Sequence, residues 1–230
     1  MKARKALDAL APLGLSVERL NLAAGHMTRA KRSLWDNARA WSNAHVRADG
    51  GDLILDREAL KLDDTDAPAR VLSAAFQWIG GATYRPRYQA LVAAATAVAA
   101  GESRTLGGVM LTAEGEGARM SRELASVAPA NAGVPNSHGI PWDSRWLVHV
   151  RPETGVPSPS PIPKGHWVAA LGDHLPQVPN WRDLGQPRAS LMATPAIFKE
   201  EGLVAAPAAG LSNGWAATLS PDFRTFLTAC

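Results

Sequence analysis

Residues 70–122 constrain the possible folds most, because the spacing of their apolar residues changes twice along the segment. Helical spacing covers residues 70–79, stops at a glycine pair, and resumes over the alanine-rich residues 86–100. From residue 109 to residue 120, apolar residues alternate with polar or flexible ones on both sides of a Glu-Gly-Glu-Gly turn. The segment therefore predicts two helices followed by a β-hairpin.

A longer helix is predicted from about Val17 to Val46, ahead of this segment. Ser16 is a favourable N-cap, and Glu18 lies in the first turn, where the helix dipole favours a carboxylate. Large apolar residues recur every seven positions and form a stripe on one face: Leu20, Met27, Leu34 and Trp41. We expect residues 49–52 (Asp-Gly-Gly-Asp) to turn the chain after this helix.

The composition changes at residues 128–141, which are rich in Pro, Gly, Ala and Asn and are typical of a linker. Beyond them, short strands separated by proline-rich loops are predicted at residues 142–150, 167–171 and 215–219. We therefore predict an α+β protein. Its mainly helical N-terminal part contains the long helix and the hairpin, and a smaller β-rich C-terminal domain follows. The predicted boundaries are 1–127 for the first part, 128–141 for the linker and 142–230 for the second part.

The chain has 230 residues and 46% hydrophobic content, which is enough to bury a sizeable core. No run of about 18 apolar residues could span a bilayer. The basic start lacks the apolar region of a signal peptide, because Asp8, Pro12 and Gly14 interrupt it. Its single cysteine, Cys230, excludes an internal disulfide framework. We expect a cytoplasmic protein with no membrane partner.

Positive charge is concentrated at the N-terminal end. Residues 1–50 hold nine Lys or Arg and four Asp or Glu, whereas residues 51–230 hold 15 and 17. The basic segment favours an anionic partner, with nucleic acid ahead of a membrane surface. The alternative is that these charges only keep an exposed helix face solvated.

Motifs of the common catalytic sites are missing from the sequence. It has no phosphate-binding loop of the Gly-x-x-x-x-Gly-Lys-Ser/Thr type and no Gly-x-Gly-x-x-Gly after a predicted strand. No two of the six histidines are spaced i, i+4, and the one cysteine is the last residue, so no metal site is predicted. No Gly-x-Ser-x-Gly elbow supports a Ser/His/Asp triad. We therefore assign no catalytic residue.

Arginines and aromatic residues remain as candidates for binding. The segment 84–88 (Tyr-Arg-Pro-Arg-Tyr) crosses the predicted start of a helix, where cations and backbone N–H groups could hold a phosphate. The alternative is that both tyrosines pack and both arginines extend to solvent. We expect Trp35 and Trp41 in the core rather than as platforms for base stacking.

Several motifs occur in the order and spacing of a known family. They are Arg70-Val-Leu-Ser, Trp78-Ile-Gly-Gly, Tyr84-x-Pro-Arg87, Thr105-Leu-Gly-Gly-x-x-Leu111, Trp142-Asp-x-Arg-Trp146, Pro187-Arg-Ala-Ser-Leu191 and Leu203-Val-Ala-Ala-Pro207. Together they resemble the part of bacterial tRNA(Ile)-lysidine synthetases that follows the catalytic domain, and residues 2–15 look like the helix that closes that domain. The resemblance covers nearly the whole chain, apart from the proline-rich residues 156–163, which look like an insertion.

The resemblance implies an ATP-dependent ligase that joins lysine to the wobble cytidine of the CAU anticodon of tRNA(Ile). In the full-length family, ATP and magnesium serve an N-terminal domain with a Ser-Gly-Gly-x-Asp-Ser pyrophosphatase loop. This sequence contains no such loop, and Met1 falls where that domain would end. We therefore expect a family member without its catalytic half, with no cofactor in this chain and no activity alone.

The resemblance also implies that the chain recognises tRNA. Its expected partners are tRNA(Ile) with a CAU anticodon, the missing catalytic domain and, in a homodimer, a second copy of the chain. The basic residues near helix starts and the hairpin are the candidate contacts: Arg4, Lys5, Arg29, Lys31, Arg32, Arg85, Arg87, Arg104, Arg119 and Arg122. One alternative is a helical protein-interaction module that binds no nucleic acid. Another is an unrelated small-molecule enzyme, which would need a preformed pocket with converging polar groups.

Overall fold

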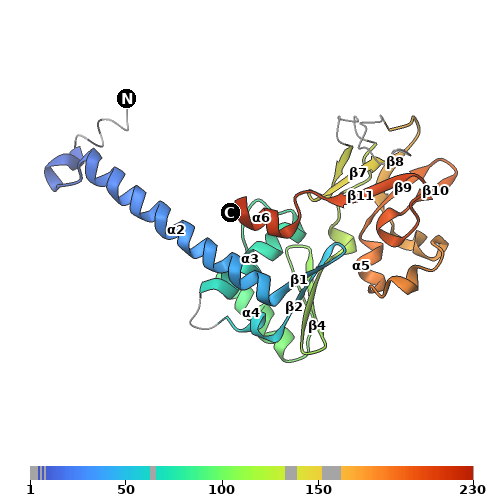
Figure 1. Ribbon diagram of the computed structural model, residues 1–230, viewed down its shortest axis with the longest axis horizontal. Coiled ribbons are helices and arrows are strands. Elements are labelled where there is room, and N and C mark those ends of the chain that lie inside the picture. Colours follow the sequence, from blue (N-terminus) through green and yellow to red (C-terminus); the bar gives the residue numbers. More distant parts are fainter. Residues whose placement is uncertain are drawn as a thin grey trace.

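The computed structural model describes residues 5, 7, 9–62, 66–132, 139–151 and 162–229. The predicted α+β class is confirmed within these residues. Figure 1 shows a long helix that projects from a body of mixed helices and strands, with the β-rich residues at the far end of the body. None of the helices in the described ranges is both long and apolar enough to cross a membrane.

The projecting element is α2, Val17–His45, and its predicted bounds are confirmed. The Ser16 side chain caps it by accepting a hydrogen bond from the backbone N–H of Arg19 at 3.3 Å. Only its C-terminal half reaches the core, through Trp35, Ala38 and Ser42. The apolar stripe is exposed before that point, and Met27 is 70% exposed. The seven-residue spacing showed which side chains share one face of the helix, but most of that face is exposed rather than packed against the core.

A five-stranded antiparallel sheet with the order β1-β2-β5-β4-β3 forms the centre of the body. Its strands are β1 (Val46–Asp49), β2 (Asp52–Leu55), β3 (Arg104–Leu106), β4 (Val109–Glu114) and β5 (Gly117–Arg122). The predicted hairpin is confirmed as β4–β5, with Val109 opposite Arg122. Strand β1 was not predicted. It pairs with β2 across a Gly50-Gly51 turn, in which the positive φ of Gly50, 59°, suits glycine.

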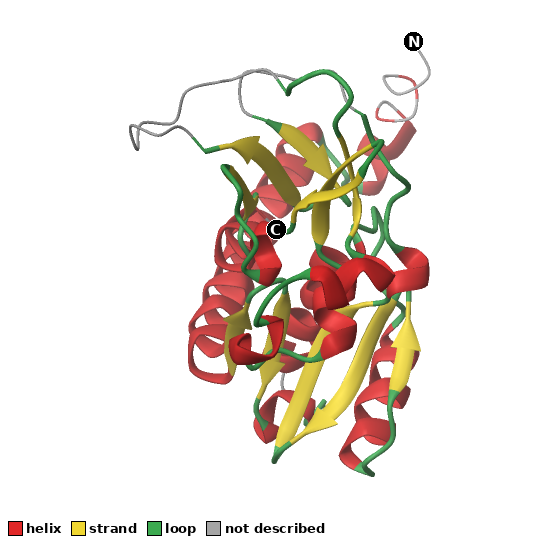
Figure 2. Ribbon diagram, turned by 90° about the vertical axis from the view of Figure 1, so that its right-hand side faces the viewer, coloured by secondary structure: helices red, strands yellow, loops and turns green. Residues whose placement is uncertain are grey.

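One face of this sheet packs against α3 (Asp66–Gly80) and α4 (Tyr88–Ala99), and Figure 2 shows the helices against the strands. Both helices were predicted. Their predicted ends, residues 79 and 100, each lie within one residue of the observed end, whereas α3 starts four residues before the predicted position. Successive strand residues point to opposite faces, so Met120 lies in the helical core while Arg119 points away from it. The core side holds mainly aliphatic and aromatic residues: Leu53, Leu55, Leu72, Phe76, Ile79, Val109, Leu111 and Met120.

The C-terminal region contains two three-stranded antiparallel sheets. One has the order β11-β7-β6, and the other has the order β10-β9-β8. The strands are β6 (Ile140–Trp142), β7 (Trp146–Val150), β8 (Trp167–Ala170), β9 (Pro195–Lys199), β10 (Gly202–Ala205) and β11 (Trp215–Leu219). The prediction of a single strand at residues 142–150 is wrong. The segment contains the turn of the β6–β7 hairpin, because Asp143 and Ser144 adopt positive φ angles of 47° and 60° and reverse the chain.

Short helices complete the fold. They are α5 (Arg188–Met192), α6 (Phe223–Ala229) and the 3-10 helices η1 (Ala11–Leu13), η2 (Arg57–Leu60), η3 (Leu124–Ser126), η4 (Gly172–Gln177), η5 (Trp181–Leu184) and η6 (Pro207–Ala209).

Helix α6 was not predicted, and it returns the end of the chain to the first core. Phe223 and Leu227 belong to the same buried cluster as α3. The indole Nε1 of Trp78 on α3 donates to the carbonyl of Pro221 at 2.9 Å. The division at residues 128–141 stays a prediction, but the structure places residues from both sides of it in one hydrophobic core.

Candidate nucleic-acid interface

Three segments that are far apart in the sequence meet around Trp35, where α2 enters the body. The Trp35 side chain is buried, with 3% of the residue exposed. The guanidinium carbon of Arg85, from the connection between α3 and α4, lies 4.8 Å from the centre of the Trp35 ring. The guanidinium carbon of Arg70 on α3 lies 5.2 Å from the same centre. An arginine within about 6 Å of an indole face is attracted to it, so Trp35 holds Arg85 beside α2.

Helix α2 adds further cations next to this contact. A hollow of about 390 Å³ is lined by Lys31, Arg32, Trp35, Asp36 and Arg39, with Thr28 on α2 and Thr228 and Ala229 on α6. Asp36 is the one carboxylate in that lining, and it is paired with Arg39. Arg39 also donates to the backbone carbonyl of Leu227 at 3.3 Å. The hollow therefore keeps an excess of positive charge from Lys31 and Arg32.

A second hollow, of about 540 Å³, adjoins the first. It is lined by Gln77, Thr83, Tyr84, Arg85, Phe226 and Ala229. Ala229 lines both hollows, and Arg85 lines the second while stacking on Trp35, which lines the first. We call the two together the α2–α6 groove. Tyr84 is 85% exposed at its edge.

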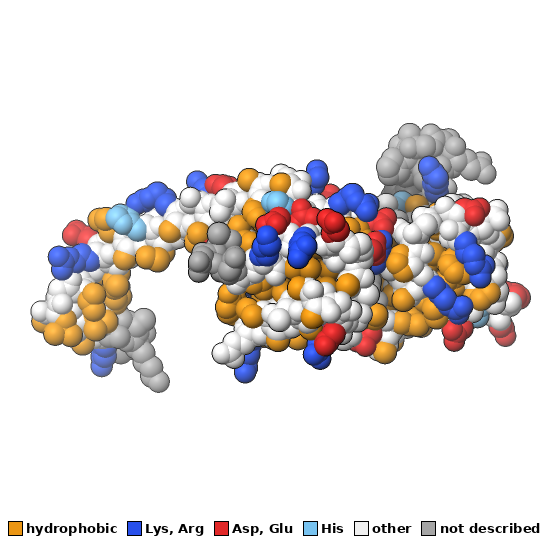
Figure 3. All heavy atoms as spheres, turned by 90° about the horizontal axis from the view of Figure 1, so that it is seen from below, with side chains coloured by type: hydrophobic (Ala, Val, Ile, Leu, Met, Phe, Trp, Pro, Cys, Tyr) orange, Lys and Arg blue, Asp and Glu red, His pale blue; other side chains and the backbone are white. Residues whose placement is uncertain are grey.

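The structure brings three of the sequence-predicted contacts together in this groove, namely Lys31, Arg32 and Arg85. Arg87 is exposed two residues beyond Arg85, where it is the N-cap residue of α4. Arg29 is exposed on the projecting part of α2. Figure 3 shows basic and apolar side chains side by side along this projecting helix.

Two further candidates, Lys5 and Arg104, do not line this groove. Lys5 is exposed near the N-terminus. Arg104 is exposed on β3 and forms an ion pair with Glu102 at 3.1 Å. Arg4 lies outside the described residues.

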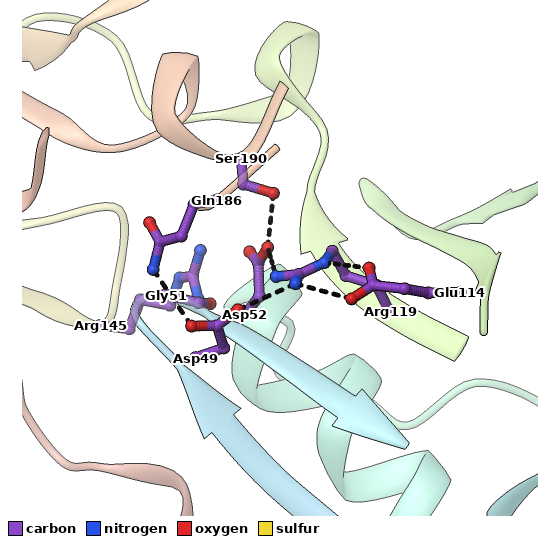
Figure 4. A network of polar contacts seen from close by, with 8 residues as sticks. All are labelled: Asp49, Gly51, Asp52, Glu114, Arg119, Arg145, Gln186 and Ser190. Atoms are coloured by element: carbon purple, nitrogen blue, oxygen red, sulfur yellow. Dashed lines mark hydrogen bonds and ion pairs between the residues drawn. The ribbon is translucent and has the colours of Figure 1, made fainter. Parts of the chain in front are cut away.

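Arg119 is buried, with 7% of the residue exposed, and it does not face solvent as a phosphate contact would. Its guanidinium donates to Asp49 and Asp52, each at 2.9 Å, and to both oxygens of Glu114 (Figure 4). Three carboxylates raise the pKa of Arg119 against the opposing effect of burial. The side chain therefore connects β1, β2, β4 and β5.

The same cluster reaches residues beyond the predicted linker. The hydroxyl of Ser190 on α5 donates to Asp52 at 2.5 Å, and the amide of Gln186 donates to Asp49 at 3.4 Å. Burial raises the pKa of Asp52, although its hydrogen bonds with Ser190 and Arg119 oppose that change. Burial also opposes ionisation of Asp49, but hydrogen bonds from Arg119 and Gln186 lower its pKa overall. These contacts fasten the C-terminal region to the open face of the sheet.

Arg122 is also buried, at 8% exposure. It forms a two-pronged ion pair with Asp143, with both N···O distances 2.9 Å, and donates to the Gly108 carbonyl at 3.0 Å. Asp143 in turn accepts from the backbone N–H of Ala128 at 2.9 Å. Arg122 therefore ties the β4–β5 hairpin to the β6–β7 turn, and its position gives it a structural role.

Arg145 was not predicted as a site residue, although it belongs to the Trp142-Asp-x-Arg-Trp146 motif. It lies between the rings of Trp78 and Trp146, with its guanidinium carbon 5.4 and 5.8 Å from their centres, and donates to the Gly51 carbonyl. Burial lowers its pKa to about 10, against the raising effect of Asp143 and Asp52. Arg145 is thus a third link between the C-terminal region and the first sheet. The tryptophans at both ends of the motif were the feature of the sequence that could have indicated it.

Metal ligands do not cluster in the part of the chain that the structure describes. No group of three or more His, Cys, Asp or Glu side chains there could hold an ion. His45 Nδ1 and Asp56 Oδ2 lie 2.8 Å apart, but no third such side chain joins them there.

Comparison with known proteins agrees with the motifs. No family model matches the chain. The tRNA(Ile)-lysidine synthase of Ruegeria pomeroyi (strain ATCC 700808 / DSM 15171 / DSS-3) is 36% identical to it over 228 residues, which are 98% of this chain and 51% of that protein. The chain thus spans about half the length of the relative it matches. This similarity confirms the predicted resemblance: over nearly its whole length, the chain is related to part of a tRNA(Ile)-lysidine synthase.

Proposed function

We propose that this chain is the tRNA-recognition portion of a tRNA(Ile)-lysidine synthase, the ligase that joins lysine to the wobble cytidine of the CAU anticodon. The observation that carries the proposal is the convergence of Lys31, Arg32 and Arg85 on Trp35. They come from segments about 50 residues apart, so the fold itself gathers them. The similarity to a tRNA-modifying enzyme supports RNA as the anion.

The electrostatics of the groove fit a phosphate backbone. Among the described residues, no carboxylate forms an ion pair with Lys31, Arg32 or Arg85. Unpaired cations can replace the counterions that surround RNA, and release of those counterions makes binding fall steeply with salt. The exposed α2 continues the basic surface beyond the groove through Arg29. Arg119 and Arg122 are left out of the proposed surface because they are buried and ion-paired.

A filter-binding series with tRNA(Ile) bearing a CAU anticodon tests the proposal. Arg85→Ala together with Arg87→Ala should weaken binding about tenfold or more. The pair should also lower the slope of log K against log salt by about one for each phosphate that is no longer neutralised. Arg182→Ala is the matched control, because Arg182 is also an exposed arginine, 4.4 Å from a tryptophan ring, but lies in the C-terminal region. Equal weakening in both variants, or no binding by the parent chain, would count against tRNA recognition by the groove.

We also propose that the chain forms no lysidine alone. The support is the lack of a Ser-Gly-Gly-x-Asp-Ser segment anywhere in the 230 residues. Incubation with tRNA, ATP, magnesium and lysine should give no modified cytidine by mass spectrometry of digested RNA. Detection of lysidine would refute this part of the proposal and leave tRNA recognition standing.

The exposed apolar stripe of α2 favours a second candidate, a protein-interaction module. Leu20 is 37% exposed, Met27 70% and Leu34 40%, so the projecting helix offers an uncovered apolar face. A homodimer through this face would give twice the chain mass in light scattering, and Met27→Glu would return it to a monomer. A dimer that binds no tRNA would favour this candidate over RNA recognition.

A further inference from the structure

We infer that the α2–α6 groove binds an unpaired nucleotide of the RNA, with its base stacked on Tyr84 and its phosphate held by Arg85 and Lys31. This inference rests on the proposed function and adds which kind of RNA element the groove accepts. Its starting point is Tyr84, the most exposed of the large hydrophobic side chains in the described ranges. An aromatic ring in that position gains little from folding and leaves most of its surface available to a ligand.

The backbone holds Tyr84 in place despite its exposure. The amide of Gln77 donates to the Thr83 carbonyl at 3.1 Å, and the Ala82 N–H donates to the Gln77 carbonyl at 3.2 Å. Gly81 adopts a φ of 65°, and a Cβ there would come within 2.8 Å of the Ser144 side chain. These contacts fix the turn just before Tyr84. The ring is therefore a platform on a fixed turn rather than the tip of a long loop.

Cations lie on one side of this platform. Arg85 is the next residue, and its guanidinium lies over the ring of Trp35 on α2, four residues along that helix from Lys31. Arg70, which stacks on the same ring, is already held by two hydrogen bonds to Asp66, at 2.5 and 2.9 Å. Arg85 has no such carboxylate partner in the described chain. Arg70 therefore supports Trp35, and Arg85 is the arginine that remains for an anion.

The hollow beside Tyr84 has the volume and the lining for a base. It is a solvent-open hollow of about 540 Å³, which leaves room for a single base. Phe226 supplies apolar surface and the Gln77 amide a polar group in that lining. An aromatic ring next to a basic groove is the arrangement with which proteins hold single-stranded nucleic acid.

A base in a duplex cannot use this arrangement. Both of its faces are covered by neighbouring bases, so Tyr84 could reach only a base that is unpaired, in a loop, a bulge or a single-stranded end. The geometry therefore selects an unpaired nucleotide, whereas Lys31 and Arg32 alone would accept any phosphate backbone. A free nucleotide has the same chemistry, so the experiment must separate it from RNA.

The test compares three labelled probes by fluorescence anisotropy: a 12-nucleotide single-stranded RNA, a blunt duplex of the same strand, and tRNA(Ile). We expect the single strand to bind at least about tenfold more tightly than the duplex. Tyr84→Ala should weaken single-strand and tRNA binding about 5- to 100-fold, the range typical when base stacking is removed. Tyr84→Phe, which keeps the ring, should stay within about twofold of the parent chain.

The salt dependence separates stacking from charge. Tyr84→Ala should leave the slope of log K against log salt unchanged, whereas Arg85→Ala should lower it by about one. Equal binding of duplex and single strand, or parent-like binding by Tyr84→Ala, would overturn the inference while the tRNA proposal stands. Binding of AMP alone as tight as that of the single strand would also overturn it. No binding of any RNA by the parent chain would instead refute the proposed function.

Discussion

The cluster around Arg119 predicts a large decrease in stability when its central cation is removed. The Arg119→Met variant keeps an apolar side chain at this position, but Asp52 loses its charged partner. Asp52 is only 3% exposed. Breaking a buried ion pair by removing one member costs about 3–5 kcal/mol, because the other charge stays buried. A typical domain has only about 5–15 kcal/mol of unfolding free energy, so the variant should unfold at far lower denaturant.

Urea unfolding followed by tryptophan fluorescence measures this decrease. Arg104→Met is the matched control, because its pair with Glu102 is exposed and should contribute at most about 1 kcal/mol. The double variant Arg119→Met with Asp52→Asn should recover part of the stability, since the asparagine carries no charge and can still accept from Ser190. A cost below about 1 kcal/mol for Arg119→Met, or strictly additive costs in the double variant, would refute the reasoning.

The pH dependence of the same variant follows from Asp52. Burial raises the pKa of Asp52, and Arg119 opposes that rise, so removing Arg119 moves the pKa in the folded state further up. The folded variant then binds a proton more tightly than the unfolded chain, and its unfolding free energy decreases as pH rises through that pKa. The destabilisation relative to the parent should therefore be larger at neutral pH than at about pH 5. An unchanged difference between these two pH values would contradict a buried, unpaired Asp52.

Three further outcomes are expected from unfolding experiments. Leu227→Ala should cost about 2–5 kcal/mol in urea, because Leu227 is 1% exposed in the core that α6 completes. Met27→Glu should change the unfolding free energy by less than about 0.5 kcal/mol, since the residue is 70% exposed; a larger change would mean that α2 packs against something. Gly81→Ala should lower the melting temperature more than Gly101→Ala, because both have positive φ but only Gly81 faces a close neighbour, the Ser144 side chain at 2.8 Å.

The sequence was most informative where local chemistry decides the structure. Ser16 marked the start of α2, and the Glu-Gly-Glu-Gly turn marked the β4–β5 hairpin, because capping and turn formation depend on residues a few positions apart. The groove was partly predicted in the same way. Lys31, Arg32 and Arg85 were named for their charge, but only the fold could show that Trp35 brings them together.

The misses share a different cause, which is contact between distant residues. Helix α6 has seven residues, too few for a clear period, and its position depends on Trp78, about 145 residues earlier. Arg119 alternates with the buried Met120, so its face was predictable, but the carboxylates and Ser190 that bury it come from four separate segments. The apolar stripe of α2 likewise predicted which face of the helix is apolar, but it could not show whether another element packs against that face.

The placement of α6 has a consequence for synthesis of the protein. Phe223 and Leu227 close a core whose other members belong largely to residues 35–120, so that core stays open until α6 leaves the ribosome. The β-rich region is therefore synthesised while the core formed by α3 and the first sheet still exposes apolar side chains to water beside Trp78. A nascent chain arrested before Pro221 should accordingly be captured by chaperones, whereas one that includes α6 should escape them.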